Sequence, residues 1–220
     1  MAQRLLLVRH ASTGEALRGR FVGRTDAPLH DDGRRQARAL AERLAGRGVD
    51  KMVCSPLCRA VETARILGSA AGLPMNGRPP RPAAEALVPV AEPDLAEIDF
   101  GRWEGRNFEE IHASDAALVD AWARFAPEFA FPEGESLAGF LDRVRRVTER
   151  LTNDPAESIL VVAHGGVVRA MLCQLLGLPA RCYLAFDIRP ACLCVVRVSD
   201  GIGVLEEMTN GDGETGKLGD

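Results

Sequence analysis

The stretch LLLVRHASTG, residues 5–14, decides the fold because a run of aliphatic residues ends abruptly in an arginine and a histidine. A strand that is buried on both faces reads as a continuous apolar run of this kind. In an open α/β sheet, ligands bind at the carboxyl ends of such strands, where the chain leaves the core. Arg9 and His10 are therefore candidates for a site at the edge of a sheet.

Composition limits the class of protein and its partners. The chain has 220 residues, is 46% hydrophobic and carries a formal net charge of -4, with its arginines scattered among acids. This length suits one domain with a substantial core, and this charge gives no reason to expect nucleic acid or an anionic membrane as partner. The N-terminal apolar run is too short for a signal peptide or a membrane span, so we expect a cytoplasmic protein.

The six cysteines form no CxxC pair and lie mostly in apolar runs. A zinc site or a redox-active pair typically uses the CxxC spacing, which is missing from this sequence. We therefore expect the cysteines to be small, reduced core residues, and we expect no bound metal. This pattern is typical of a protein from a reducing compartment.

Strands and helices alternate along the chain, which predicts an α/β sandwich with a mainly parallel sheet. Strands or β-rich segments are expected at 4–8, 51–54, 158–163, 183–188 and 191–198. Helices are expected at 31–47, 56–72, 107–126, 136–151 and 167–177. We expect a single domain over 1–205, with a helical insertion at about 77–135 over the site and a flexible tail at 206–220.

A second strand ends in the same way as the first. SILVVA, residues 158–163, runs into His164 and two glycines that open a helix, where free backbone N–H groups favour an anion. Arg59 lies in the first turn of a helix that follows another strand, and so it belongs to the same edge. Its planar guanidinium suits phosphate oxygens. These residues together predict a phosphate pocket.

Six motifs follow one another over roughly residues 4–178: VRHAST, GRFVGRTDAPLHDDGRRQA, CSPLCRAVETA, EIDFGRWEG, GESL and VVAHGGVVRA. In this order they resemble the motifs of the histidine phosphatase superfamily, the group of phosphoglycerate mutase-like phosphatases. The resemblance implies a phosphoglycerate mutase-like fold, a three-layer α/β/α sandwich with a mainly parallel central sheet and with its site at the carboxyl edge of that sheet. It also implies a mechanism that passes through a phosphohistidine.

The resemblance assigns roles to individual residues. His10 matches the nucleophile that attacks phosphorus, and Glu97, the acid of EIDFG, matches the proton donor to the leaving oxygen. Arg9, Arg59 and His164 match the pocket that holds the phosphoryl oxygens, with His164 counted among the catalytic residues. Phosphoryl transfer depends on positioning and charge neutralisation, which two arginines supply. We therefore expect neither a metal nor another cofactor.

The loop after the nucleophile holds further candidates. Thr13 matches a hydroxyl that often touches the phosphate in this family. Arg20 and Arg24 are candidates for binding a second anionic group of the substrate. Phe100 and Trp103 are interpreted as packing residues rather than as a surface that stacks on the substrate.

The sequence departs from the family pattern at three positions. Ala11 and Ser12 stand where Gly-Glu is usual, and Ala16 stands where many members have an asparagine that donates to the phosphate. One phosphate donor is therefore missing or replaced by another side chain such as Ser12. Phosphate affinity and substrate choice stay open on this account.

The function implied by the resemblance is metal-independent hydrolysis of small phosphomonoesters, such as a sugar phosphate, a phosphoglycerate or α-ribazole phosphate. The α-ribazole phosphatase and broad-specificity branches are the most similar. One alternative is a cofactor-dependent phosphoglycerate mutase, although such mutases usually carry a longer insertion after the EIDFGRWEG-like motif. Another is a non-catalytic domain that binds a phosphate ligand, although every residue of the catalytic motifs is present. The oligomeric state stays open, with a homodimer as one alternative.

Overall fold

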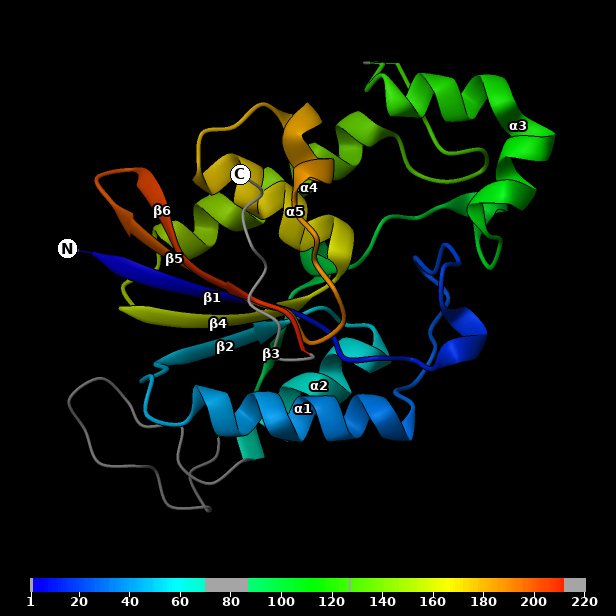
Figure 1. The fold of residues 1–220 in the computed structure, drawn as a ribbon. Helices are drawn as coiled ribbons and strands as arrows, with labels where there is room; N and C mark the ends of the chain where they lie inside the picture. Colours follow the sequence, from blue (N-terminus) through cyan, green and yellow to red (C-terminus); the bar gives the residue numbers. More distant parts are fainter. Residues whose placement is uncertain (1, 70–86, 127, 212–220) are drawn as a thin grey trace, which may run out of the picture.

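The computed structural model describes residues 2–69, 87–126 and 128–211. Its centre is a six-stranded sheet with the strand order β3-β2-β4-β1-β5-β6 (Figure 1). The strands are β1 (Gln3–Arg9), β2 (Lys51–Cys54), β3 (Val90–Ala91), β4 (Ser158–Ala163), β5 (Leu193–Ser199) and β6 (Ile202–Thr209). The pairs from β3 to β1 are parallel, and β5 and β6 add two antiparallel pairs. The mainly parallel sheet is as predicted.

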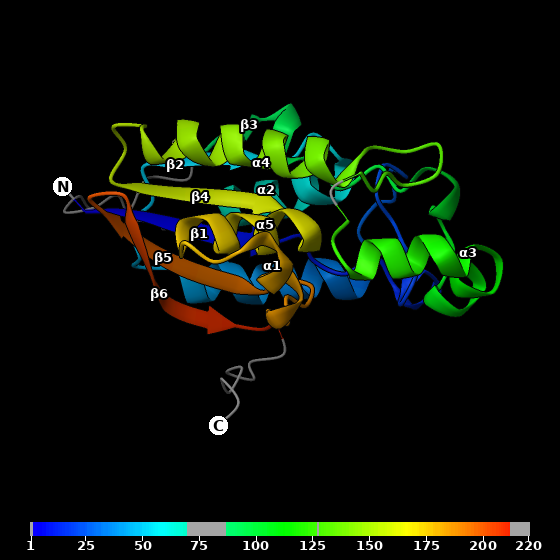
Figure 2. The same ribbon diagram turned by 90° about the horizontal axis from the view of Figure 1, so that it is seen from above.

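Helices cover both faces of this sheet (Figure 2). The helices are α1 (Asp31–Leu44), α2 (Cys58–Ser69), α3 (Phe108–Ala123), α4 (Leu137–Thr152) and α5 (Gly165–Leu175). α1 and α2 lie on one face, and α4 and α5 lie on the other, while α3 lies beyond the edge where β1, β2 and β4 end. The predicted three-layer α/β/α architecture is confirmed.

The alternation of side chains along each strand divides the core in two. Leu5 and Leu7 of β1 pack in the cluster that contains α4 and α5. Leu6 and Val8 point to the opposite face and pack with α1 and α2. Both faces of the strand are therefore buried, as its continuous apolar run indicates.

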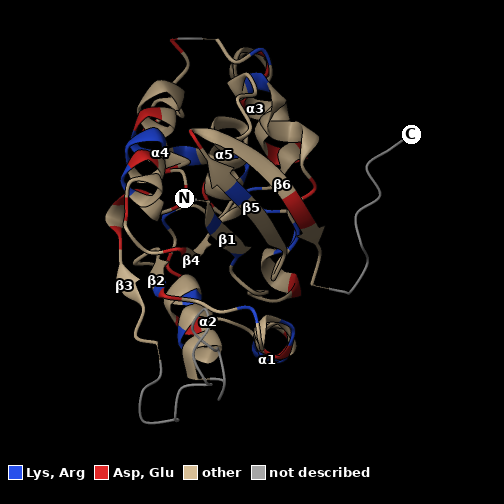
Figure 3. Ribbon diagram, turned by 90° about the vertical axis from the view of Figure 1, so that its left-hand side faces the viewer, with Lys and Arg blue, Asp and Glu red and all other residues tan. Residues whose placement is uncertain are grey.

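Charged side chains lie on the outer surfaces of the helices. Blue and red segments alternate along α4 (Figure 3), where Arg145 and Arg146 both pair with Asp142. These pairs are half-exposed and contribute little to stability, as expected for a solvated face. In the described part of the chain, no helix combines the length and apolar character that crossing a membrane requires.

The register of the parallel strands brings three strand ends together. Arg9 at the end of β1 pairs with Ala163 at the end of β4, and Cys54 at the end of β2 pairs with Val162. The residues that directly follow these strands therefore leave the sheet side by side. They are His10, Ser55 and His164.

One predicted β-rich segment is wrong. Residues 183–188 begin inside a 3₁₀ helix, Ala180–Ala185, instead of joining the sheet. Their apolar side chains, Tyr183, Phe186 and Ile188, are buried in the core cluster that contains α5. These buried residues are three and two positions apart, which suits a loop that packs on a helix. In a strand with one buried face, every second residue would be buried.

The predicted tail at 206–220 also needs correction. Residues 206–209 belong to β6, which pairs with β5 along its whole length. Asp200 and Gly201, both with positive φ, form the tight turn between the two strands. An Asp-Gly pair between alternating segments is a strong hairpin signal, and the flexible-tail prediction overlooked it. Residues 212–220 lie outside the described part of the chain.

Helix α2 begins two residues later than predicted, at Cys58 rather than Pro56. The N–H of Cys58 donates to Oδ1 of Asp26 at 2.7 Å, and Ser55 Oγ accepts from the N–H of Leu57 at 3.3 Å. The predicted end of this helix and the start of the insertion fall outside the described residues. The rest of the predicted insertion contains β3, two 3₁₀ turns and α3.

Candidate active site

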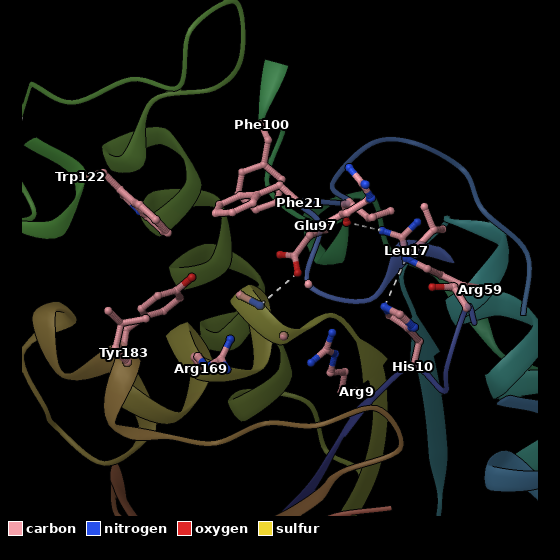
Figure 4. A pocket seen from close by; sticks show the side chains of 17 residues that line it. Arg9, His10, Leu17, Phe21, Arg59, Glu97, Phe100, Trp122, Arg169 and Tyr183 are labelled. Atoms are coloured by element: carbon pink, nitrogen blue, oxygen red, sulfur yellow. Dashed lines mark hydrogen bonds between the residues drawn. The ribbon is translucent and has the colours of Figure 1, made fainter. Parts of the chain in front are cut away.

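A cavity of about 270 Å³ lies at the carboxyl edge of the parallel strands (Figure 4). Six of the residues singled out in the sequence line it: Arg9, His10, Thr13, Arg20, Arg59 and Glu97. A second, wider cavity of about 680 Å³ adjoins it and shares Arg9, His10 and Thr13. The strand ends therefore meet around one solvent-connected space.

His10 is held in one protonation state by its two neighbours. Its Nδ1 lies 2.7 Å from the carbonyl oxygen of Ala11, which can only accept, so Nδ1 carries the proton. Its Nε2 accepts from Nε of Arg59 at 3.3 Å. Burial, reinforced by Arg9 and Arg59, holds the pKa of His10 well below its usual range. The imidazole is therefore neutral at pH 7, with its lone pair on Nε2.

Arg59 joins His10 to the loop that follows it in the chain. Its guanidinium donates to the carbonyl oxygens of Val22, Gly23 and Thr25, at 3.3, 2.7 and 2.8 Å. The side chain is wholly buried, and burial lowers its pKa, although an arginine stays charged in proteins. This positive charge is thus fixed within reach of His10.

Two buried polar atoms near His10 have no hydrogen-bond partner. They are Nε of Arg9 and Nδ1 of His164. His164 packs edge-on against His10, with ring centroids 5.0 Å apart, and its Nε2 lies 2.7 Å from Ser55 Oγ. That hydroxyl accepts from Leu57 and has a proton to donate to Nε2, and in this tautomer the proton of His164 resides on Nδ1. Unpartnered N–H donors beside His10 are suited to bind the oxygens of an anion.

His164 is also neutral. Burial is the largest cause that holds its pKa well below the usual range, and His10, Arg59 and Arg9 act in the same direction. A neutral imidazole that offers an N–H can donate a hydrogen bond to a phosphoryl oxygen. The sequence placed His164 at this strand end, and the structure brings it against His10.

Glu97 lies on the opposite side of the cavity from His10, with its carboxyl group directed into the space (Figure 4). Its Oε1 accepts from the N–H of Ile98 at 3.1 Å, and its Oε2 accepts from the N–H of Gly166 at 3.1 Å. The free N–H at the start of α5 therefore holds the carboxyl group. Glu97 is only 8% exposed, so it faces the cavity and little bulk water.

The remaining candidates from the sequence lie farther out. Thr13 lines both cavities. Arg20 lines them too, but its Nη1 already donates to the carbonyl of Gly105 at 2.8 Å and pairs with Glu110 at 3.3 Å. Arg24 is not among the described residues that line either cavity, so the expected reach of its side chain toward a substrate is not observed.

Two polar side chains of the cavity, those of Arg169 and Tyr183, were missed in the sequence. Arg169, one turn into α5, lines the cavity and donates from Nε to the carbonyl of Phe186 at 2.8 Å, and no described carboxylate pairs with it. Tyr183 lies under its guanidinium, 5.8 Å from ring centroid to Cζ. Burial, followed by the Glu97 carboxylate, raises the pKa of Tyr183 to about 12, so the phenol stays neutral. The sequence could have identified Arg169, because it lies within the motif VVAHGGVVRA, on the helix that directly follows His164.

Aromatic side chains form the outer wall of the cavity. Phe21, Phe100 and Trp122 line it, with Phe21 edge-on to both others at 5.0 and 5.7 Å between centroids. Trp103 lies behind this wall, fully buried, and donates from Nε1 to Asp115 at 2.9 Å. The packing role predicted for Trp103 thus fits its burial, whereas Phe100 also faces the cavity.

A neutral histidine, buried arginines and a carboxyl group around one cavity at a strand edge are typical of enzymes that transfer phosphoryl groups. The family model of the histidine phosphatase superfamily (branch 1) matches residues 5–211. The chain belongs to the histidine phosphatase superfamily, in which it is a phosphoric monoester hydrolase.

Similar proteins agree with this assignment. The adenosylcobalamin/α-ribazole phosphatase of Escherichia coli is 30% identical over 94% of this chain and 96% of its own length. A glucosyl-3-phosphoglycerate phosphatase of Mycolicibacterium vanbaalenii is 32% identical over 80% of this chain and 76% of its own. The crystal structure of the α-ribazole phosphatase of Shigella flexneri superposes with a TM-score of 0.78 at 28% identity, covering 94% of this chain and 96% of that one.

Proposed function

We propose that this phosphatase hydrolyses small phosphomonoesters without a metal, through a phosphohistidine on His10. The observation that carries the proposal is the state of His10, which is neutral, protonated on Nδ1 and aligned by Arg59. A neutral imidazole is a nucleophile at pH 7, and a covalent intermediate divides one difficult step into two. The unpartnered donors on Arg9 and His164 support a phosphoryl group at the same place.

In the first step, Nε2 of His10 forms a bond to phosphorus while the bond from phosphorus to the leaving oxygen breaks. The leaving oxygen takes the proton of Glu97. In the second step, water attacks the phosphohistidine and gives a proton to the Glu97 carboxylate, and the electron pair of the P–N bond returns to Nε2. The same carboxyl group thus serves as acid and then as base.

Charge balance supports metal independence. The guanidiniums of Arg9, Arg59 and Arg169 face the single carboxyl of Glu97 around neutral histidines, while Arg20 is paired with Glu110. With Glu97 protonated, as the first step requires, the cavity holds an excess of three positive charges, which more than offsets a phosphomonoester that carries nearly two negative charges at pH 7. Guanidinium N–H groups also supply the hydrogen bonds that stabilise charge on the phosphoryl oxygens.

The aromatic wall of Phe21, Phe100 and Trp122 faces the side of the cavity where Glu97 protonates the leaving oxygen, and we propose that it contacts the leaving alcohol. α-Ribazole phosphate is the first substrate to test, because relatives that match nearly the whole chain bear that name. Glucosyl-3-phosphoglycerate comes next. A phosphoglycerate mutase is the competing function, and it requires return of the phosphoryl group to the substrate.

The location and assembly of the protein remain predictions. All six cysteines are free thiols, and four of them are buried, which supports a reducing compartment such as the cytoplasm. A homodimer is one alternative for the oligomeric state, to be measured by light scattering.

The test is release of inorganic phosphate in the presence of EDTA from a panel of phosphomonoesters. The panel contains α-ribazole phosphate, glucosyl-3-phosphoglycerate, 3-phosphoglycerate, phosphoserine and fructose 2,6-bisphosphate. We expect metal-independent release that is lost in His10→Ala, and a phosphoenzyme that is stable in base and labile in acid. Interconversion of phosphoglycerates in the presence of 2,3-bisphosphoglycerate, without net release, would instead identify a mutase.

A further inference from the structure

A buried arginine lies behind the segment that carries Glu97. Arg143, on the inner face of α4, donates from Nη1 to the carbonyl oxygens of Asp94 and Ala96 at 2.8 and 2.6 Å. Its Nη2 donates to the carbonyl oxygen of Glu97 itself at 3.0 Å. One guanidinium thus binds three carbonyls within four consecutive residues.

Glu135 completes the arrangement from the other side. Its carboxylate binds Arg143 in a bidentate manner, with Nε–Oε2 at 3.0 Å and Nη2–Oε1 at 2.6 Å. Oε1 also accepts from the N–H of Asp99 at 3.1 Å, and the N–H of Glu135 donates back to the carbonyl of Asp99 at 3.0 Å. The Arg143–Glu135 pair is therefore hydrogen-bonded to the backbone on both sides of Glu97.

The ion pair between Arg143 and Glu135 is unusual because it is largely buried. The side chains are 9% and 19% exposed, and the ring of Phe140 lies 5.0 Å from the Arg143 guanidinium. A buried ion pair contributes little net stability, because the loss of hydration offsets the attraction. Fixing the geometry of a functional segment is the role that such a pair can perform better than apolar residues of the same size.

The carboxyl group of Glu97 depends on this backbone for its position. Among the described residues, the partners of its side chain are the N–H groups of Ile98 and Gly166. Ile98 itself belongs to the segment that the ion pair holds. A rotation of the segment would move the carboxyl group away from the leaving oxygen. Hydrogen-bond reach is required for proton transfer, and errors of about 1 Å cost up to ~100-fold in rate.

We propose that Arg143 and Glu135 are positioning residues that hold Glu97 in place as the general acid. The proposal rests on the proposed function. It predicts a particular defect in kcat/KM, which reports the steps up to phosphoryl transfer to His10, because in those steps only the departure of the leaving oxygen needs the proton of Glu97. The later role of Glu97 as base affects kcat for every substrate alike. A phenolic leaving group such as p-nitrophenolate departs without help, whereas an alkoxide does not.

The test compares Arg143→Lys with wild type on two substrates, p-nitrophenyl phosphate and an alkyl phosphate. Lysine keeps the charge but lacks the planar fork, so it cannot bind three carbonyls and a carboxylate together. We expect kcat/KM on the alkyl phosphate to fall by roughly 10- to 100-fold, part of the ~10²–10⁴-fold supplied by a general acid. We expect kcat/KM on p-nitrophenyl phosphate to fall by less than about threefold, and the loss in kcat/KM to grow as the pKa of the leaving alcohol rises.

Arg150→Lys is the matched control. Arg150 lies on the same helix and pairs with the side chains of Glu92 and Asp94 at 3.1 and 2.9 Å, but it is half-exposed and binds none of the carbonyls next to Glu97. It should behave like wild type on both substrates. Glu135→Gln, which keeps the size of the side chain and weakens the ion pair, should reproduce the selective defect of Arg143→Lys in a milder form.

The outcomes separate this proposal from the proposed function. Glu97→Gln must show the selective loss first; if it does not, the role of Glu97 as acid fails, whatever Arg143 does. If Glu97→Gln is selective but Arg143→Lys and Glu135→Gln lose activity equally on both substrates, or not at all, the positioning role is overturned. Failure of both variants to fold, judged by circular dichroism, would also overturn it, because the pair would then serve folding alone.

Discussion

Nε of Arg59 lies 3.3 Å from Nε2 of His10, on the lone pair that we propose attacks phosphorus. The other nitrogens of the guanidinium are hydrogen-bonded to the carbonyls of the 22–25 loop. When Nε2 bonds to phosphorus, the N–H of Arg59 loses its acceptor, and a phosphoryl oxygen arrives at the same moment. One donor thus aligns the nucleophile in the resting enzyme and stabilises charge during transfer, without reorganising.

Arg59→Lys should therefore damage catalysis more than folding. Lysine retains the positive charge but has no Nε–H in the plane of the fork, so it cannot bind both the loop carbonyls and His10. We expect kcat/KM to fall by roughly 10²–10³-fold, comparable to the loss of one oxyanion donor. Steady-state hydrolysis of p-nitrophenyl phosphate measures this, with Arg20→Lys at the cavity rim as control. Near-normal activity of Arg59→Lys would contradict the role of the fork.

Glu104 acts on Arg59 from a distance. Its carboxylate accepts from the N–H groups of Gly23, Arg24 and Thr25 at 2.8–3.2 Å, and from the Thr25 hydroxyl at 2.7 Å. The carbonyls of this same loop receive the Arg59 guanidinium. Glu104→Gln turns an amide NH₂ toward N–H donors, so we expect a loss of about 1–3 kcal/mol in unfolding free energy.

The activity of Glu104→Gln should also fall, by roughly tenfold in kcat/KM, because a loosened loop no longer fixes Arg59. Glu109→Gln, an exposed acid at the start of α3, is the control and should leave both stability and activity unchanged. Urea unfolding and initial rates report the two effects. A stability loss in Glu104→Gln without any loss of activity would show that the loop does not position Arg59.

The two buried histidines make stability depend on pH. The pKa values of His10 and His164 are well below 6.5 in the folded protein, mainly through burial, so the unfolded chain binds more protons near pH 6 than the folded one. Stability is then fully present above the unfolded pKa of about 6.5 and is lost as pH falls below it. Each histidine contributes a slope of about 1.4 kcal/mol per pH unit in that range.

Urea unfolding between pH 7 and pH 5 tests this dependence, because ordinary carboxyl groups titrate mostly below that window. We expect the unfolding free energy to decrease steadily on acidification in wild type, and the slope to flatten in His10→Gln combined with His164→Gln. An equal slope in wild type and in the double variant would mean that the two histidines are not neutral in the folded protein.

Much of the site can be predicted from the sequence because its main residues follow strand ends. Arg9, His10 and His164 come directly after or at the end of apolar runs, and the carboxyl ends of parallel strands meet at one edge by geometry. Glu97 was identified from its motif, EIDFG. The pattern of apolar residues around it did not indicate in which direction its carboxyl group would point. These local signals sufficed to place the phosphate pocket.

The parts that escaped prediction depend on contacts between distant segments. Tyr183 reaches the cavity from a 3₁₀ helix whose apolar residues resemble a short strand. Arg143 and Glu135 meet the Glu97 segment across about 40 residues of chain, and helical patterning marks Arg143 only as another charge on α4. β6 was not predicted as a strand, because Glu206, Glu207 and Thr209 interrupt its apolar residues. Such a mixture is typical of an edge strand with one solvated face. Tertiary packing decides each of these cases.

Gly166 offers a direct way to displace the proposed acid while leaving the fold intact. A Cβ on this residue would lie 2.5 Å from Oε1 of Glu97 and 3.2 Å from the end of the Ile98 side chain. The first contact is too close to persist, and the tip of a flexible side chain is what gives way. Gly166→Ala should thus push the Glu97 carboxyl group out of its place beside the N–H of residue 166.

We expect Gly166→Ala to keep its melting temperature within a few degrees and to lose roughly 10²-fold in kcat on alkyl phosphates, in line with the contribution of a general acid. Gly165→Ala is the matched control one residue earlier, because its Cβ would lie 3.3 Å from Nη1 of Arg169 and 3.5 Å from the Arg9 guanidinium. That substitution crowds the guanidiniums of Arg9 and Arg169 and does not displace Glu97. It should therefore raise KM and change leaving-group dependence little. If the two alanine variants instead lose activity in the same way on p-nitrophenyl and alkyl phosphates, displacement of Glu97 is not the cause, and the carboxyl group does not protonate the leaving oxygen from this position.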